Sequence, residues 1–309
     1  MLTPDQILTA IDAIPPFGEN GERQYLGASE IGNECSRYLW LKFHKYITPE
    51  VFEPRMHRLF HRGHDQEGYF EYYLRELGFE IIENCYSQVR FKDGFFSGAP
   101  DGIVSKDGVK YVCEYKTHSL KSFDKLKLGD LEKDFPKHFA QMQINGSKFG
   151  CSHAIYLAVC KNDDRLFCDV IEIDLTKVKA IEDKAECISM ADKPPERIAT
   201  KSTAFACKFC HAKNVCWGFE MPRVNCKNCT SVEKNRSDGT WSCDSHKQLD
   251  VRGSCEAHSW NPHAMNDLLQ WSPIEFHPKQ RAVEYKLPDG SILINGKSPF
   301  GIGSKDLKI

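Results

Sequence analysis

Two acidic residues and a lysine lie on the two arms of a short hairpin predicted between residues 98 and 116. Asp107-Gly108 is a strong signal for a two-residue turn, because both central positions of the favoured turn have positive φ. The register that follows from this turn places Asp101 directly opposite Glu114. Lys116 is two residues beyond Glu114 and therefore lies on the same face of its strand. The hairpin thus brings two carboxylates and an ammonium group to one point.

Such a group is suited to hydrolysis of a phosphodiester with a divalent metal ion. Two carboxylates this close repel each other unless a cation lies between them. Mg²⁺ or Mn²⁺ accepts oxygen ligands, including a backbone carbonyl such as that of Tyr115, and keeps positions open for water and phosphate. Lys116 would orient or help to deprotonate the attacking water and neutralise the developing charge. The alternative is a solvated cross-strand ion cluster, but the apolar segment Tyr111–Cys113 argues against a surface strand.

The hairpin resembles the PD-(D/E)XK nuclease superfamily, with Pro100-Asp101 and Glu114-Tyr115-Lys116 as the motif. Upstream, Arg62-Gly63 and Glu67 look like the helical G-x3-E of the lambda-exonuclease-like and RecB-like branches, where the acid supports a metal or its water. Downstream, Gln141 lies in a segment similar to the glutamine helix of these branches. The resemblance covers roughly residues 25–175. It implies a catalytic set of Glu67, Asp101, Glu114, Lys116 and Gln141 in a restriction-endonuclease-like α/β core.

The chain has 14 cysteines, and three of them form the pattern Cys207-x2-Cys210-x5-Cys216. This set is one ligand short of the four that a zinc ion or a cubane cluster needs. A local zinc site with His211 is one possibility, although His211 directly follows Cys210, which makes joint ligation awkward. The sequence is similar here to RecB-like nucleases that close a 4Fe–4S cluster with a distant cysteine before the nuclease core. That resemblance implies that Cys35 is the fourth ligand.

A second metal pattern follows, with spacing typical of a zinc ribbon or finger. Its first three ligands are Cys226, Cys229 and Cys243, and Cys255 is favoured as the fourth from the family resemblance and the strength of thiolate as a ligand. His246 and His258 are the alternative fourth ligands. The segment also contains basic and aromatic residues that are compatible with contact to nucleic acid: Lys227, Lys234, Arg236 and Trp241. A structural zinc staple for a small module without its own core is an equally good interpretation.

Hydrophobic periodicity and breaker residues predict the remaining elements. Helices are expected near the N-terminus and over 55–77, 136–150 and 175–192. Strands are expected over 86–92, 95–98, 101–116, 153–160 and 167–174, with a last hairpin over 282–296. Helices and strands mix without strict alternation, which predicts an α/β core with a partly antiparallel sheet. The expected domains are a nuclease core (1–221), a zinc-binding module (222–262) and a short C-terminal hairpin segment (263–309).

Composition restricts the function further. The formal net charge is −2, which weighs slightly against a protein that coats DNA but not against an enzyme with a local basic groove. The first residues do not resemble a signal peptide and no apolar run could span a bilayer, so a cytoplasmic protein is expected. The resemblance implies a phage-type exonuclease that acts on DNA in recombination, replication or repair, and a recombination or replication protein is the candidate partner. A structure-specific endonuclease and a non-catalytic DNA-binding scaffold are the alternatives.

Overall fold

The computed structural model describes most of the chain. The described residues are 2–15, 22–87, 89–243, 249, 253–255, 258–269, 273–277, 282–286, 290 and 292–295. Within them, no helix is long and apolar enough to cross a membrane.

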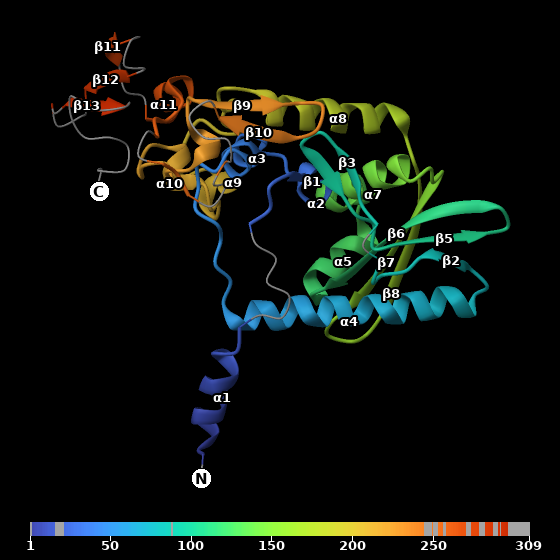
Figure 1. The fold of residues 1–309 in the computed structure, drawn as a ribbon. Helices are drawn as coiled ribbons and strands as arrows, with labels where there is room; N and C mark the ends of the chain where they lie inside the picture. Colours follow the sequence, from blue (N-terminus) through green and yellow to red (C-terminus); the bar gives the residue numbers. More distant parts are fainter. Residues whose placement is uncertain are drawn as a thin grey trace.

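A five-stranded mixed sheet lies between α4 and α7, on the right of Figure 1. Its strands, in spatial order, are β2 (Glu80–Glu83), β5 (Gly102–Lys106), β6 (Val109–His118), β7 (His153–Cys160) and β8 (Leu166–Glu172). Strands β6 and β7 are parallel, and every other neighbouring pair is antiparallel. Helices cover both faces, so the expected α/β class with a partly antiparallel sheet is confirmed.

One face of the sheet is covered by the long helix α4 (Pro54–Glu76), which buries Phe70 and Leu74 against it. Proline in its first turn and Gly78 after its last turn mark the ends of α4, because Gly78 has a φ of +82°. The opposite face is covered by α5 (Leu120–Leu128), α6 (Leu131–Asp134) and α7 (Pro136–Lys148). Met142 of α7 packs there against apolar side chains of the central strands.

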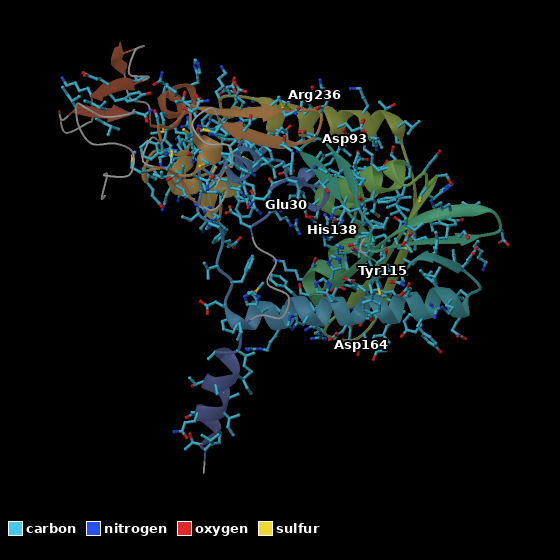
Figure 2. All side chains as sticks on the ribbon, viewed as in Figure 1. Glu30, Asp93, Tyr115, His138, Asp164 and Arg236 are labelled. Atoms are coloured by element: carbon cyan, nitrogen blue, oxygen red, sulfur yellow. The ribbon has the colours of Figure 1, made fainter. Side chains whose placement is uncertain are left out.

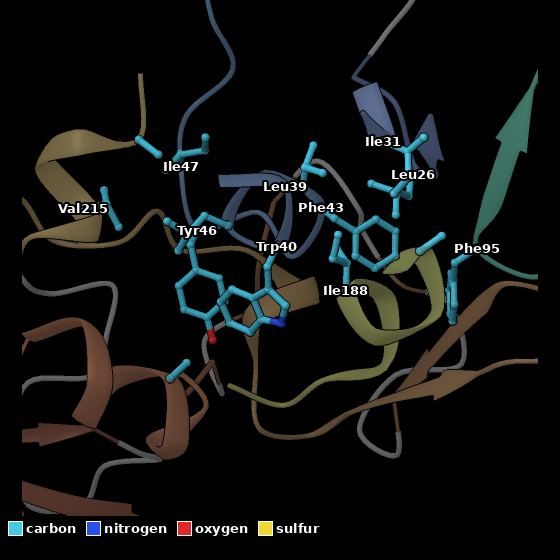
Figure 3. Packing of buried hydrophobic residues seen from close by; sticks show 14 of the residues in the cluster. Leu26, Ile31, Leu39, Trp40, Phe43, Tyr46, Ile47, Phe95, Ile188 and Val215 are labelled. Atoms are coloured by element: carbon cyan, nitrogen blue, oxygen red, sulfur yellow. The ribbon is translucent and has the colours of Figure 1, made fainter. Parts of the chain in front are cut away.

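A second apolar cluster joins the N-terminal segment to the C-terminal part of the described chain (Figure 3). Trp40 and Tyr46 lie at its centre, with ring centroids 4.9 Å apart. The contributing helices are α2 (Ala28–Ile31), α3 (Ser36–Phe43), α7, α8 (Leu175–Met190), α10 (Lys213–Cys216) and α11 (Pro262–Leu269). The same cluster includes Val283 and Leu293, so segments from the beginning and the end of the described chain share one core.

The smaller elements complete the fold. They are α1 (Pro4–Asp12), β1 (Leu26–Gly27), β3 (Phe91–Asp93), β4 (Phe96–Gly98), α9 (Phe205–Lys208), a 3₁₀ turn at Cys226–Asn228, β9 (Val232–Asn235), β10 (Thr240–Cys243), β11 (Pro273–His277), β12 (Ala282–Lys286) and β13 (Ile292–Asn295). Helix α2 contacts the start of α7 so closely that a Cβ on Gly32 would lie 2.2 Å from the carbonyl oxygen of Pro136. This contact fixes the position of the first turn of α7.

Most predicted elements are confirmed, with two corrections. The strand expected over 86–92 is reduced to β3, and an additional strand, β2, precedes it. The residues of β2 alternate between exposed and partly buried at the edge of the sheet, so the hydrophobic pattern of this segment is weak. The segment 121–134, which is rich in charged residues and for which no helix or strand was expected, forms α5 and α6, because Phe123 and Leu126 share one buried helix face despite the surrounding lysines. The expected hairpin over 282–296 is present as antiparallel β12 and β13 in its described part.

Candidate active site

The hairpin between β5 and β6 has the register expected from its turn. Asp107 and Gly108 both have positive φ, +51° and +79°, and Gly102 pairs with Cys113. Asp101 therefore directly precedes β5 and lies opposite Glu114. One oxygen of Asp101, Oδ2, accepts a hydrogen bond from the backbone N–H of Tyr115 at 2.8 Å, which fixes the carboxylate on this face.

Lys116 joins the two carboxylates. Its Nζ lies 2.6 Å from Oε1 of Glu114, 3.1 Å from Oδ2 of Asp101 and 2.9 Å from the carbonyl oxygen of Tyr115. The three protons of the ammonium group thus meet three acceptors. Burial lowers the pKa of Lys116, but Asp101 and Glu114 more than offset this effect, so its pKa is raised and the group is a fixed positive charge.

Glu114 is the most buried acid of the site, with 1% of its surface exposed. Burial, and then repulsion from Asp101 and Glu67, raise the pKa of Glu114 to about 8, although Lys116 acts in the opposite direction. Apart from its ion pair with Lys116, neither carboxylate oxygen of Glu114 has a hydrogen-bond partner. Leaving buried oxygens without donors is costly, so these oxygens are suited to a further cation.

Glu67 approaches the same point from α4. Burial, and then the negative charge of Asp101, raise the pKa of Glu67 to about 7. His64 contacts Oε1 of Glu67 at 3.2 Å and opposes this shift. Two carboxylates therefore meet one ammonium group on the hairpin, and a third carboxyl group on α4 is near enough for the charges of Asp101 and Lys116 to act on it.

Gln141 lies on α7 and is 7% exposed. One turn further along, Asn145 donates a hydrogen bond to the carbonyl of Ala99, so this part of α7 lies over the segment that leads to Asp101. No hydrogen bond from Gln141 to the three acids is present among the described residues. The side-chain amide of Gln143, in contrast, is fully engaged within the protein. Its Nε2 donates to the carbonyl of Glu172, and its Oε1 accepts from the backbone N–H of Asp174.

Sequence reasoning did not find a second polar group beside the acids. Tyr156 of β7 lies next to Glu114 in the parallel register, and its hydroxyl contacts His118 at 2.8 Å and His138 at 2.9 Å. The available signal was the position of His118, which is two residues beyond Lys116 and so on the same strand face. Figure 2 shows His138 and Tyr115 in the region where α5, α7 and the central strands meet.

The first cysteine set is gathered around one small pocket. Cys35 lines it together with Cys207, Cys210 and Cys216, although the chain separates Cys35 widely from the others. His211, the alternative ligand, instead contacts the carbonyl oxygen of Thr48 at 2.8 Å and lines another cavity. In the described part of the chain, no three His, Cys, Asp or Glu side chains already surround one point as metal ligands would.

The second cysteine set is also brought together. Cys226 has a raised pKa because of burial and then of the nearby thiols of Cys255, Cys229 and Cys243. Among the alternative ligands, His258 is buried and its Nε2 contacts the carbonyl of Asn225 and the side chain of Asn228. His246 lies outside the described residues.

Lys227 and Trp241 of this cysteine-rich segment pack against the rest of the protein, whereas Arg236 is exposed. Lys227 is 2% exposed, contacts the carbonyl of Gln24 at 3.1 Å and lies 4.9 Å from the ring centre of Trp241. Trp241 packs in turn against Phe43 and Phe95. The structure therefore uses these groups to attach the β9–β10 hairpin to the core, and contact of Lys227 or Trp241 with nucleic acid is not supported.

Two further contacts complete this attachment. Nζ of Lys234 lies 2.6 Å from the carbonyl oxygen of Met190, at the end of α8, and Arg236 forms an ion pair with Glu186. The hairpin turn meets the β3–β4 turn so closely that a Cβ on Gly239 would lie 1.9 Å from the carbonyl oxygen of Gly94.

No family model and no curated protein sequence matches the chain. Among solved structures, it is similar to an alkaline exonuclease (LHK-Exo) from Laribacter hongkongensis, with 18% identity, a TM-score of 0.41, and coverage of 54% of this chain and 87% of that one. A complex of LHK-Exo with dAMP gives 19% identity, a TM-score of 0.39, and coverage of 53% and 86%. The structure of SSO0001 gives 17% identity, a TM-score of 0.39, and coverage of 64% and 89%.

Proposed function

We propose that the chain is a divalent-metal-dependent nuclease that hydrolyses phosphodiester bonds of DNA. The observation that carries this proposal is the contact of Lys116 with both Asp101 and Glu114, together with the buried oxygens of Glu114, which have no partner apart from this ion pair. Glu67 adds a third acid whose pKa responds to the charge of Asp101. A purely structural ion cluster would be better satisfied without this third acid, because neighbouring like charges raise each other's pKa.

The residues present fit a hard divalent cation such as Mg²⁺ or Mn²⁺. Asp101, Glu114 and the carbonyl of Tyr115 would hold it, and Glu67 and Gln141 would support it or its water. When bound, such an ion lowers the pKa of a bound water and polarises the phosphate. Lys116 holds a permanent positive charge beside the acids, where it orients the attacking water and stabilises the negative charge of the transition state.

Within this class, we propose an exonuclease of phage type that acts on DNA in the cytoplasm during recombination, replication or repair. The support is the motif order that residues 25–175 share with the lambda-exonuclease-like branch. A structure-specific endonuclease is the second candidate, and a non-catalytic DNA-binding scaffold is the third. The pKa values of Glu114 and Glu67 argue against a scaffold, because a binding module gains nothing from such unfavourable charges.

The two cysteine sets fit two metal centres. We propose a 4Fe–4S cluster on Cys35, Cys207, Cys210 and Cys216, supported by their common pocket and by the engagement of His211 elsewhere. We further propose a zinc ion on Cys226, Cys229, Cys243 and Cys255, supported by the mutual influence of these thiols. These centres would belong to a nuclease core over 1–221 and a zinc-binding module over 222–262, before the C-terminal segment 263–309.

Elemental analysis of protein purified without oxygen tests both centres separately. Cys35→Ser should remove iron and leave zinc, whereas Cys229→Ser should remove zinc and leave iron. Full iron content in Cys35→Ser would contradict the long-range cluster. Retention of zinc by Cys229→Ser would contradict the second site.

End-labelled DNA tests the activity. We expect cleavage of linear DNA with Mg²⁺ and none with a chelator, and a circular substrate should remain intact if the enzyme is an exonuclease. Cleavage of the circle would select the endonuclease alternative. Binding of DNA without cleavage under either divalent ion would select the scaffold.

A further inference from the structure

Four polar side chains form a continuous chain of hydrogen bonds beside the carboxylates. The Ser122 hydroxyl contacts Nδ1 of His118 at 2.8 Å, and Nε2 of His118 contacts the Tyr156 hydroxyl at 2.8 Å. The same hydroxyl contacts Nδ1 of His138 at 2.9 Å. This series of hydrogen bonds runs from α5 through β6 and β7 to α7, so it joins elements that are separate in the sequence.

One end of this chain lies at the proposed reaction site. Tyr156 is next to Glu114 in the β6–β7 register, and His138 is three residues before Gln141, hence on the same side of α7. The described residues offer Nε2 of His138 no hydrogen-bond partner, and His138 is only partly buried. The other end, Ser122, is partly exposed on the first turn of α5.

The catalytic lysine is not suited to accept a proton in this arrangement. Its three N–H groups already meet Glu114, Asp101 and the Tyr115 carbonyl. An imidazole with a free nitrogen is the ordinary alternative for a general base. Both imidazoles of the chain favour the neutral form, because burial and then Lys116 lower their pKa values. The pKa of His118 falls to about 4, with Lys161 contributing, and that of His138 to about 3, with His118 and Lys137 contributing.

We propose that Ser122, His118, Tyr156 and His138 form a proton relay that carries the proton of the attacking water from the active site to solvent. This inference rests on the proposed nuclease function. The water O–H bond breaks as the proton binds Nε2 of His138. In the same concerted step, the Nδ1 proton of His138 passes to the Tyr156 oxygen, whose own proton passes to Nε2 of His118, so that neither ring becomes an imidazolium. The Nδ1 proton of His118 passes to Ser122, which releases its proton to solvent.

The single proton of the Tyr156 hydroxyl imposes a rule on the two rings. If Tyr156 donates to His138, then His118 must donate its Nε2 proton to Tyr156, and both rings carry their proton on Nε2. If Tyr156 donates to His118, both rings carry it on Nδ1. The relay therefore requires His118 and His138 to have the same tautomer at any moment, and passage of one proton switches both.

Nitrogen NMR of the full-length protein with ¹⁵N-labelled histidine tests this rule without any cleavage assay. We expect His118 and His138, assigned with His118→Gln and His138→Gln, to show matching tautomers and to remain neutral down to about pH 5. Tyr156→Phe should remove the match, because the shared hydroxyl is lost. Opposite tautomers in the native protein, or a pKa near 6.5 for either ring, would overturn the relay.

Steady-state cleavage tests the role of the relay in catalysis. Tyr156→Phe should lower kcat at least about tenfold with little change in KM, since general acid–base catalysis contributes roughly 100- to 10,000-fold. The solvent deuterium effect on kcat should fall with it. Added imidazole should restore part of the rate of His138→Ala, which a purely structural role would not allow. The matched control is Tyr111→Phe on β6, whose ring packs against Phe79 and His153 away from the relay.

The outcomes separate the two proposals. If the tautomers match but the native protein does not cleave DNA, the proposed nuclease function is wrong. The four side chains are then hydrogen-bonded as described but do not serve DNA cleavage. If the native protein cleaves DNA and Tyr156→Phe keeps its kcat and solvent deuterium effect, the function stands and the relay is wrong. An equal loss of kcat in Tyr111→Phe would also reject the relay.

Discussion

The acidic site and the β9–β10 hairpin both place charged groups in the interior, but they satisfy these groups differently. At the hairpin, Lys234 and Lys227 of the preceding 3₁₀ turn each reach backbone carbonyls of the core, and Trp241 packs between aromatic rings. At the acidic site, Glu114 is as buried as Lys227, yet its oxygens have no hydrogen-bond partner apart from the ion pair with Lys116, and its neighbours include two more acids. Satisfied charges stabilise the attachment of a segment, whereas unsatisfied charges of one sign are retained at a cost that only a function explains.

The largest effect on activity is expected from substitutions in the acidic site. Glu114→Gln and Lys116→Ala should each lower the rate of Mg²⁺-dependent DNA cleavage at least about 100-fold, because loss of a ligand or of the positive charge removes several kcal/mol of transition-state stabilisation. The rate is measured with purified protein on labelled DNA. Glu80→Gln on β2 of the same sheet is the control, since Glu80 is exposed and should leave the rate unchanged. Near-native cleavage by Glu114→Gln would reject the site.

A large effect on stability is expected at the hairpin. Trp241→Ala should lower the free energy of unfolding by about 3 kcal/mol, because it removes a ring that packs against Phe43 and Phe95. Chemical denaturation measures this change. At a temperature where the variant is folded, its kcat should equal that of the native protein. A specific loss of DNA affinity without a loss of stability would show that Trp241 contacts the substrate after all.

The two regions should respond to pH in opposite directions. The pKa of Glu114 is raised from 4.5 to about 8, so the folded protein binds the extra proton and loses stability as the pH rises through this range. The pKa of His44, which packs against Trp241, is lowered below 6.5 by burial and by Lys234 and Lys227. Its contribution to stability is therefore lost as the pH falls below about 6.5.

Thermal unfolding in the presence of a chelator, followed from about pH 5 to 9, measures both slopes. Glu114→Gln should remove much of the loss at high pH and raise the unfolding temperature there. His44→Gln should reduce the loss at low pH. Addition of Mg²⁺ should stabilise the native protein at high pH and stabilise Glu114→Gln much less. If the pH dependence of the unfolding temperature is unchanged in Glu114→Gln, other groups balance the charge of the Glu114 carboxylate in solution.

The smallest effect is expected for Arg236→Ala. The ion pair of Arg236 with Glu186 is exposed on both sides, and such pairs contribute about 0–1 kcal/mol. Stability should therefore change by less than about 1 kcal/mol, and DNA affinity at moderate salt should be unchanged. A clear loss of affinity would indicate that Arg236 leaves Glu186 to bind phosphate.

The features predicted correctly from the sequence depend on residues close together in the chain. The register of the β5–β6 hairpin follows from Asp107-Gly108, one of the few residue pairs that readily adopt positive φ at both positions. The ends of α4 and α7 follow from proline in the first turn and glycine after the last. Local chemistry therefore sufficed to bring Asp101, Glu114 and Lys116 together.

The features that were missed depend on contacts between distant segments. The interior position of Lys227 requires the carbonyl of Gln24, which is far away in the chain. Its charge alone suggested a nucleic-acid surface. The chain from Ser122 to His138 uses three residues from different elements around Tyr156, and each of them alone has the character of an ordinary core or surface residue. The hydrophobic periodicity of the sequence does not indicate contacts between side chains of distant segments.

The shared core of the two ends has a consequence for protein synthesis. Trp40 and Tyr46 belong to the same apolar cluster as Met265 and Tyr285, and buried Arg37 is paired with Asp267. All proposed catalytic residues leave the ribosome well before these partners, by about ten seconds at 5–20 residues per second. A nascent or prematurely released chain thus contains the acids and Lys116 but has no completed core to support α2 against α7. Cleavage of DNA is therefore expected only from chains whose synthesis has passed the region of Tyr285.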